Sequence, residues 1–193
     1  MSESVQTMER PSGGSETDYE AIVIGAGVCG IYQLHRLLEL GVSATVLEAG
    51  EDLGGTWFWN RYPGARFDSE SITYGYSFSE ELLQEWDWKE RFSGQPENLR
   101  YLNHVADKFD LRPHMQFGIT VEHAVYDDAT TTWTLQLDDG RELTCHFLVL
   151  AIGLLSAPRR CRATTASRSS RASRSTRTTG PRSRSRWPAS ASV

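Results

Sequence analysis

The 193-residue sequence is poor in cysteine and contains no long apolar run. Its three cysteines, Cys29, Cys145 and Cys161, show neither the close pairing of a zinc site nor the even number of a disulfide framework. No run of about eighteen apolar residues occurs, and residues 1–17 lack the apolar core of a signal peptide, so neither a membrane span nor a secretion signal is predicted. We expect a cytoplasmic protein in which residues 1–17 form a flexible lead-in.

Histidine is also sparse, since the sequence contains only five. His104, His114 and His123 are too scattered to resemble a ligand set, and each is expected to be solvated or hydrogen-bonded. No metal site is therefore predicted.

Acidic residues are absent from the last part of the chain. From Arg159 to Val193 there are ten arginines and no lysine, aspartate or glutamate, whereas the preceding residues carry the other ten basic residues and all 25 acidic ones. The length suits one domain of ordinary size. The sequence thus divides into an acidic domain over residues 18–157 and a basic tail over residues 158–193.

The domain opens with a strand and a glycine-rich turn. Ala21–Ile24 is a short continuous apolar run, typical of a strand buried on both faces of a parallel sheet. Gly25, Gly27 and Gly30 follow it as G-x-G-x-x-G. The first glycine permits a tight turn, the second lets backbone approach a pyrophosphate, and the third lets the next helix pack closely on the strand. A dinucleotide-binding turn is predicted.

A helix and a second strand complete this unit. Gly41 stands where a helix C-terminal glycine belongs, and Ala44–Leu47 leads to Glu48, eighteen residues after Gly30, where a carboxylate can accept the ribose hydroxyls of an adenosine. Cys29 is expected to be a small packing residue without a redox role. A β-α-β unit whose glycines serve only packing is the alternative. The apolar face of the predicted helix is Ile31, Leu34, Leu37 and Leu38.

An aromatic stretch follows a second pair of glycines. Gly54 and Gly55 let backbone lie against a flat ligand, and Thr56 and Trp57 come directly after them. Three charged side chains are expected to be buried or half-buried and therefore paired: Arg61, Arg66 and Asp68.

Residues 54–68 fit the pattern [A/G]-G-x-W-x-x-x-x-[F/Y]-P-[G/M]-x-x-x-D at every fixed place. This pattern resembles the one typical of class I Baeyer–Villiger monooxygenases, a branch of the flavin-containing monooxygenases. The resemblance implies an α/β fold, namely a three-layer Rossmann-like FAD-binding domain with a parallel sheet, a β-meander and a helical excursion. It also implies an enzyme that uses NADPH and O2 to oxidise ketones to esters or lactones.

The resemblance further implies roles for individual residues. Gly25, Gly27 and Gly30 would approach the FAD pyrophosphate, and Glu48 would bind its ribose. Asp68 is the implied catalytic residue, which would lie near the flavin and orient an arginine from a later part of the family's chain through charge-assisted hydrogen bonds. The other implied cofactor contacts are Gly55, Thr56, Trp57, Phe67 and Tyr74 at the flavin and Val121 at the adenine end.

The second half of the domain is predicted to contain helices and then strands. Residues 79–112 are expected to form two helices separated at Ser93-Gly94, with Pro96 in the first turn of the second helix. Strands follow from Ile119, Asp139-Gly140 indicates a hairpin, and Phe147–Ala151 is expected to return to the parallel sheet. The apolar face of the second helix is Leu99, Leu102, Val105, Ala106 and Phe109.

The basic tail has three interpretations: a nucleic-acid-binding arm, a disordered linker and an out-of-frame translation. A reading frame shifted by one base permits F-x-G-x-x-x-H-x-x-x-W-P, which resembles the best-known fingerprint of the family. The required bases are supplied at Ser170, Ala172, Thr176, Gly180 and Pro181. We therefore expect a base gained or lost near the codons for 157–159, and no nucleic-acid partner.

The chain itself is expected to be catalytically inactive, because it lacks a second glycine motif for NADPH, the active-site arginine and most of a substrate pocket. Two other functions are considered. One is a flavin monooxygenase that oxygenates nitrogen or sulfur, and the other is a non-catalytic binding module with a basic arm.

Overall fold

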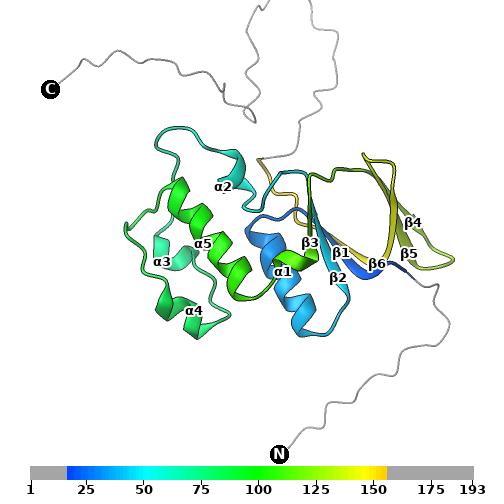
Figure 1. Ribbon diagram of the computed structural model, residues 1–193, viewed down its shortest axis with the longest axis horizontal. Coiled ribbons are helices and arrows are strands. Elements are labelled where there is room, and N and C mark those ends of the chain that lie inside the picture. Colours follow the sequence, from blue (N-terminus) through cyan, green and yellow to red (C-terminus); the bar gives the residue numbers. More distant parts are fainter. Residues whose placement is uncertain (1–16, 156–193) are drawn as a thin grey trace, which may run out of the picture.

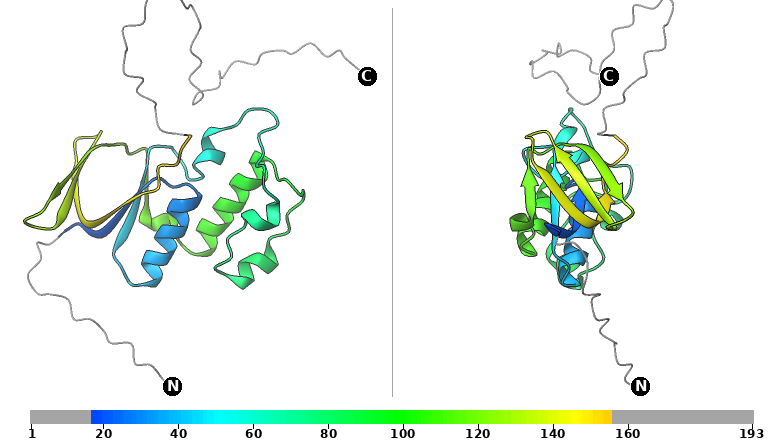
Figure 2. Two further views of the ribbon diagram at one scale, coloured as in Figure 1. Left: turned by 180° about the vertical axis from the view of Figure 1, so that it is seen from behind. Right: turned by 90° about the vertical axis from the view of Figure 1, so that its right-hand side faces the viewer.

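The computed structural model describes residues 17–155, which form three layers (Figure 1). Helices cover one face of a set of parallel strands, and antiparallel strands lie on the other side, as the left view of Figure 2 shows. The predicted three-layer α/β fold is therefore confirmed. Almost all of the predicted lead-in and the whole basic tail lie outside the described residues.

Four strands build the parallel part of the sheet. They are β1 (Tyr19–Ile24), β2 (Ala44–Glu48), β3 (Met115–Phe117) and β6 (Glu142–Leu150). The sheet order is β3-β2-β1-β6-β5-β4. Strand β3 was not predicted, because three residues are too few to show a strand period.

The antiparallel strands β4 (Val121–Asp127) and β5 (Thr132–Leu137) continue the same sheet. β5 pairs with the first part of β6, from Gln136↔Glu142 to Trp133↔Cys145. β6 then runs parallel to β1, with Ala21↔Phe147 and Ile24↔Leu150 as partners. The predicted hairpin and the predicted return to the parallel sheet are both confirmed.

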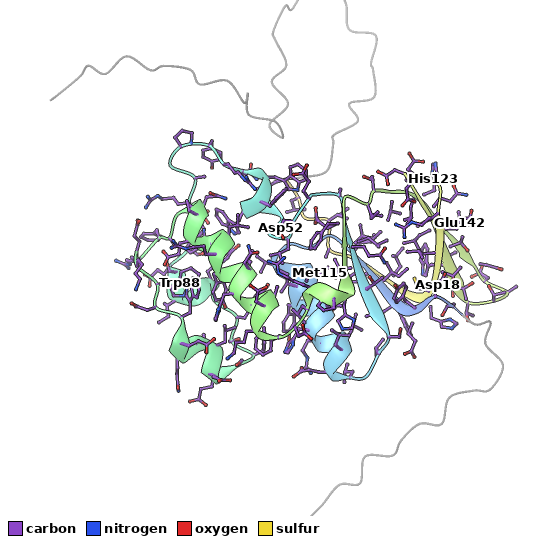
Figure 3. The ribbon with its side chains drawn as sticks, in the orientation of Figure 1. Asp18, Asp52, Trp88, Met115, His123 and Glu142 are labelled. Carbon is purple, nitrogen blue, oxygen red and sulfur yellow. The ribbon has the colours of Figure 1, made fainter. Side chains whose placement is uncertain are left out.

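Two separate cores lie on the two faces of the parallel strands. The larger core packs the helices against residues such as Ala21 and Val23 of β1, which are fully buried. The smaller core packs Ile22 and Leu47 against Leu135 and Leu137 of β5. Figure 3 shows the side chains that fill the two regions, with Trp88 in the helical layer and His123 of β4 and Glu142 of β6 in the antiparallel part of the sheet.

Helix α1 (Val28–Glu39) has the predicted apolar face. Ile31 and Leu34 are fully buried, and Leu37 and Leu38 are partly buried against the larger core. Gly41 ends the helix in a left-handed conformation, with φ of 71°. The Gly41 N–H donates to Leu38 and the Val42 N–H donates to Leu37, which are the two bonds of a Schellman motif.

The predicted helical region over residues 79–112 is less regular than expected. It contains α4 (Glu80–Glu85) and α5 (Gln95–Lys108), and the 3-10 turn η1 (Arg112–His114) begins at its end. Two further short helices, α2 (Thr56–Trp59) and α3 (Ser71–Tyr74), precede it. The break at Ser93-Gly94 is confirmed, since Gly94 is the N-cap of α5 and Pro96 lies in its first turn.

The first predicted helix of the excursion stops early, at Glu85. Trp86 and Trp88 both pack on Tyr101 of α5, with ring centroids 5.2 and 4.9 Å away. Residues two apart face the same side in an extended chain but not in a helix. The chain is therefore extended where these two tryptophans contact α5.

None of the helices found between residues 17 and 155 is both long and apolar enough to cross a membrane.

Candidate cofactor site

The first glycine turn connects β1 to α1 at the carboxyl end of the parallel strands. Gly25 has φ of 102°, and its N–H donates to the Leu47 carbonyl oxygen of β2 at 2.8 Å. A Cβ atom at Gly25 would lie 2.6 Å from the Ala151 carbonyl oxygen, and one at Gly30 would overlap the Gly25 carbonyl oxygen. The close packing predicted for Gly30 is thus confirmed. Larger residues at both positions would force the turn apart.

The second glycine pair lies directly on the first glycine turn. The Gly54 N–H donates to the Ala26 carbonyl oxygen at 2.8 Å. Gly55 has φ of 51°, and a Cβ atom there would lie 2.7 Å from the Cα atom of Gly27. The sequence shows two separate glycine motifs, but not that they touch. Their contact leaves an all-backbone surface at the end of the sheet where ligands bind in α/β proteins.

Helix α1 begins at this surface. Its N-cap is Gly27, which offers no side-chain cap, and its first turn contains no acidic residue. The first N–H groups of a helix lack partners within the helix, and the helix dipole favours negative charge there. The turn is therefore suited to a pyrophosphate group.

Glu48 lies at the end of β2 beside the turn and is only 6% exposed. Its Oε2 atom accepts from the Ala26 N–H at 2.7 Å, and its Oε1 atom accepts from the Gly50 N–H at 2.8 Å. Each carboxylate oxygen has a further acceptor position. Glu48 thus connects β2 to the glycine turn, a role that the sequence did not reveal, and keeps the capacity to accept hydroxyl groups.

The segment just before Val121 is hydrogen-bonded to the end of β2, where Glu48 lies. The Ile119 N–H donates to the Glu48 carbonyl oxygen at 3.0 Å, and the Gly118 N–H donates to Gly50 at 2.8 Å. β4 starts two residues later, and Val121 packs against the smaller core. The structure therefore brings the beginning of β4 to the same end of the sheet as Glu48.

Three of the predicted flavin contacts form one aromatic cluster. Trp57 and Phe67 are buried, and Tyr74 is half-buried. The Trp57 Nε1–H donates to the Tyr74 hydroxyl at 2.7 Å, and the Phe67 and Tyr74 rings stack with centroids 4.4 Å apart. Burial raises the pKa of Tyr74, against the opposing effect of the Trp57 hydrogen bond. Thr56 is half-buried at the start of α2, between this cluster and Gly55.

The expected burial of charge in this stretch is wrong, although the two arginines do have partners. Arg61, Arg66 and Asp68 are all exposed. Arg61 donates to the Phe58 carbonyl oxygen at 2.8 Å, and Arg66 pairs with Glu90 at 3.1 Å. The side chains lie at the surface because residues 60–70 form a mostly irregular loop that only a few members, such as Phe67, anchor to the core.

Asp68 follows Phe67 directly, so it lies beside the aromatic cluster. Within residues 17–155 it has neither a hydrogen bond nor an ion pair. Its carboxylate is consequently available to a partner from outside the described part of the chain.

Cys29 also differs from its expected role. It is exposed in the first turn of α1 and is not a packing residue. Helical position explains the difference, because the apolar face of α1 includes Ile31 and Leu34 and residue 29 points away from it.

Two residues that contact the site were not predicted from the sequence. The Gln95 side chain donates to the Trp57 carbonyl oxygen, and the Tyr76 hydroxyl donates to the Val28 carbonyl oxygen at 2.6 Å. Neither stands in a recognisable motif or period. Nothing in the local sequence around either residue indicates its partner.

Other features of the described residues do not converge on this site. One hollow of about 330 Å³ lies between α3 and α4, next to Trp86 and Trp88, and a second lies along α5 beside Arg61 and Arg100. Within residues 17–155, no group of histidine, cysteine and acidic side chains could hold a metal ion.

Similarity to known proteins agrees with this geometry. Residues 23–86 match a family model described as an NAD(P)-binding Rossmann-like domain. An acetone monooxygenase (methyl acetate-forming) of Gordonia sp. (strain TY-5) is 46% identical over 146 residues, which are 76% of this chain and 27% of that protein. A Baeyer–Villiger monooxygenase of Pseudooceanicola batsensis is 44% identical over 155 residues, which are 80% of this chain and 28% of that protein.

A solved structure is similar to the same degree. The crystal structure of OTEMO in complex with FAD and NADP has a TM-score of 0.71 and 47% identity, covering 75% of this chain and 28% of that one. This chain spans little more than a quarter of the length of the relatives it matches. By these similarities it belongs to the family of Baeyer–Villiger and related FAD-binding monooxygenases.

Proposed function

We propose that residues 17–155 hold FAD. The observation that carries the proposal is the contact between the two glycine motifs at the start of α1, where a Cβ atom on Gly55 would lie 2.7 Å from the Gly27 Cα atom. Such an all-backbone surface at a helix N-terminus fits a pyrophosphate. The matching family model describes an NAD(P)-binding domain, and both kinds of dinucleotide share the adenosine and the pyrophosphate.

The aromatic cluster favours FAD over a nicotinamide dinucleotide. Trp57, Phe67 and Tyr74 offer a wide, flat and largely apolar wall near the second glycine pair. A planar ring system gains from stacking and apolar burial against such a wall. We infer that Gly25, Gly27 and Gly30 face the pyrophosphate and that Gly55, Thr56 and the aromatic cluster face the flavin. Glu48 would accept ribose hydroxyls, and Val121 would lie near the adenine.

For a protein with the full length of these relatives we propose an NADPH- and O2-dependent oxidation of a ketone to an ester or lactone. The acetone monooxygenase among the relatives forms methyl acetate, which is an ester made from a ketone. In the overall reaction one oxygen atom enters beside the carbonyl carbon, the other leaves as water, and NADPH supplies the two electrons. Bound FAD would supply the redox chemistry that connects NADPH to O2.

Asp68 is proposed as the catalytic residue of this chain. Its exposed carboxylate has no partner between residues 17 and 155, and it follows a member of the aromatic cluster. A carboxylate in that place can fix the direction of a guanidinium group through charge-assisted hydrogen bonds. The arginine would come from the part of the family's length that this chain does not span.

The experiment that tests the FAD proposal is a titration of the 193-residue chain with FAD, followed by quenching of flavin fluorescence. We expect saturable binding that Gly55→Ala abolishes and Gly140→Ala leaves unchanged, because a Cβ atom at Gly140 meets no atom within 4 Å. Absence of saturable binding in the wild-type chain overturns the proposal. We expect no NADPH oxidation by this chain, and turnover would contradict the proposed incompleteness of the site.

We also propose that residues 158–193 are translated out of frame and that the protein works in a reducing, cytoplasmic setting. The alignments to relatives leave about a fifth of the chain or more without a counterpart, and within residues 17–155 neither Cys29 nor Cys145 forms a disulfide. Resequencing the gene from the codon for Leu150 onward tests the first proposal. A sequence that confirms the tail as written would refute the frame change.

A further inference from the structure

Two parts of the proposed FAD site are connected by a short segment, Tyr74–Tyr76, which we name the tyrosine strap. At one end the Tyr74 hydroxyl accepts the Trp57 indole N–H and belongs to the aromatic cluster. At the other end the Tyr76 hydroxyl donates to the Val28 carbonyl oxygen at 2.6 Å. The strap therefore contacts both the flavin side and the phosphate side of the site.

The position of Val28 gives this second contact its importance. Val28 is the first residue of α1, directly after the N-cap Gly27. An anion bound at this helix N-terminus would accept hydrogen bonds from the N–H groups of this first turn. A hydroxyl that holds the Val28 carbonyl group thus acts on the orientation of the peptide groups in the proposed pyrophosphate cradle.

Helix α5 also fixes the position of the strap. The Tyr76 N–H donates to the Tyr101 hydroxyl of α5 at 2.7 Å, and Tyr101 is only 2% exposed. The Tyr76 ring lies within 5.4 to 6.2 Å of the rings of Tyr32, Phe78 and Tyr101. Its position is therefore set by α1, the strap and α5 together.

Burial, aided by the neighbouring Tyr101, raises the pKa of Tyr76 well above its ordinary value. The hydroxyl therefore stays protonated at neutral pH, which the hydrogen bond to a carbonyl oxygen requires.

We infer that Tyr76 is a positioning residue for FAD, because its hydroxyl couples the first turn of α1 to the aromatic cluster. This inference rests on the proposed function. It predicts that the hydroxyl group, and not the ring alone, contributes to FAD affinity.

The test compares Tyr76→Phe with Tyr32→Phe in the full 193-residue chain. Both substitutions remove one hydroxyl group from the same ring cluster, but within the described residues the Tyr32 hydroxyl has no hydrogen bond. We expect Tyr76→Phe to raise the dissociation constant for FAD about five- to tenfold, the effect of losing one hydrogen bond. Tyr32→Phe should leave the constant unchanged.

Hydrogen exchange separates positioning from general stability. In apo Tyr76→Phe, amide exchange should become faster in the first turn of α1 and stay unchanged in β4 and β5. A uniform increase in exchange, or a loss of FAD affinity that simply follows a lower melting temperature, would overturn the inference.

The remaining outcomes are distinct. If wild-type chain binds FAD and Tyr76→Phe binds it equally well, the inference is wrong and the proposed function stands. If the wild-type chain binds no FAD, the proposed function fails and the inference fails with it. Tyr101→Phe loosens the strap but keeps the Val28 bond, so an equal or larger loss of affinity for this variant would also contradict the inference.

Discussion

The glycine turn after the central strand β1 and the antiparallel strands β4 to β6 belong to one sheet but differ in how strictly they restrict the sequence. At the turn, backbone atoms approach so closely that single added methyl groups clash, as at Gly25, Gly30 and Gly55. In the antiparallel strands β4 to β6, every residue of β4 after Val121 is exposed, and a Cβ atom on Gly140, in the turn from β5 to β6, meets nothing within 4 Å. Residue identity is thus restricted by close backbone contact at the turn, whereas the exposed positions of the antiparallel strands leave space for other side chains.

The largest effect that we predict comes from placing the same substitution in both regions. Gly30→Ala forces a methyl group onto the Gly25 carbonyl oxygen and should lower the free energy of unfolding by at least about 3 kcal/mol, with loss of FAD binding. Gly140→Ala meets only the cost of its positive φ of 87°, about 1 to 2 kcal/mol. Urea unfolding followed by circular dichroism measures both, and equal losses would remove the distinction between the regions.

Glu48→Gln should have the next largest effect. The carboxylate accepts two buried N–H groups, from Ala26 and Gly50, whereas an amide has only one oxygen and would face the other N–H with its own donors. We expect a loss of about 2 to 3 kcal/mol in unfolding free energy. The matched variant Glu142→Gln changes an exposed carboxylate at the start of β6 and should cost no more than about 0.5 kcal/mol. A cost at Glu142 as large as that at Glu48 would contradict the prediction.

The third prediction concerns how stability depends on pH through Cys145, a buried member of the smaller core. Burial raises the pKa of the Cys145 thiol to about 11, from an ordinary value near 9. The unfolded thiol ionises first as the pH rises, so stability present below about pH 9 is lost progressively up to about pH 11, at roughly 1 kcal/mol for the first unit.

Urea midpoints measured between pH 7 and 10 check this prediction. Cys145→Ala should show a smaller loss of stability with rising pH than the wild-type chain. Cys29→Ala, at an exposed position, should follow the wild-type curve. Identical slopes for wild type and Cys145→Ala would show that the thiol is not responsible.

The smallest effect on stability is expected at the outer side of β6. β5 pairs with this strand only as far as Cys145, and Phe147 beyond it is 66% exposed. Phe147→Thr should change the free energy of unfolding by no more than about 0.5 kcal/mol but reduce self-association, because it removes an exposed apolar side chain. Light scattering against concentration measures the latter, and a large loss of stability would show that Phe147 is part of the core.

Several elements could be predicted because their signals are local. The run Ala21–Ile24, the glycine spacing and Gly41 each have a backbone reason that acts within a few residues. The return of Phe147–Ala151 to the sheet was predictable from its continuous apolar character, and it pairs with β1 as expected.

Other features depended on partners distant in sequence. The chain from Trp86 onward leaves the helix to pack on Tyr101. Arg61, Arg66 and Asp68 lie exposed although Trp57 and Phe67 in the same stretch are buried. Tyr76 and Val28 are 48 residues apart, and nothing near either of them indicates the hydrogen bond that joins them. Burial and pairing of such groups depend on what the folded chain places beside them.

The sequence by itself determined the family, the β-α-β unit and the identity of the residues that could face a dinucleotide, because these depend on short-range backbone requirements and on a motif of fixed spacing. Only the tertiary structure decided that Gly27 and Gly55 touch, that Glu48 binds two backbone N–H groups, and that Asp68 is left exposed. These features arise where separate segments meet, and close packing between segments is not encoded in any one of them.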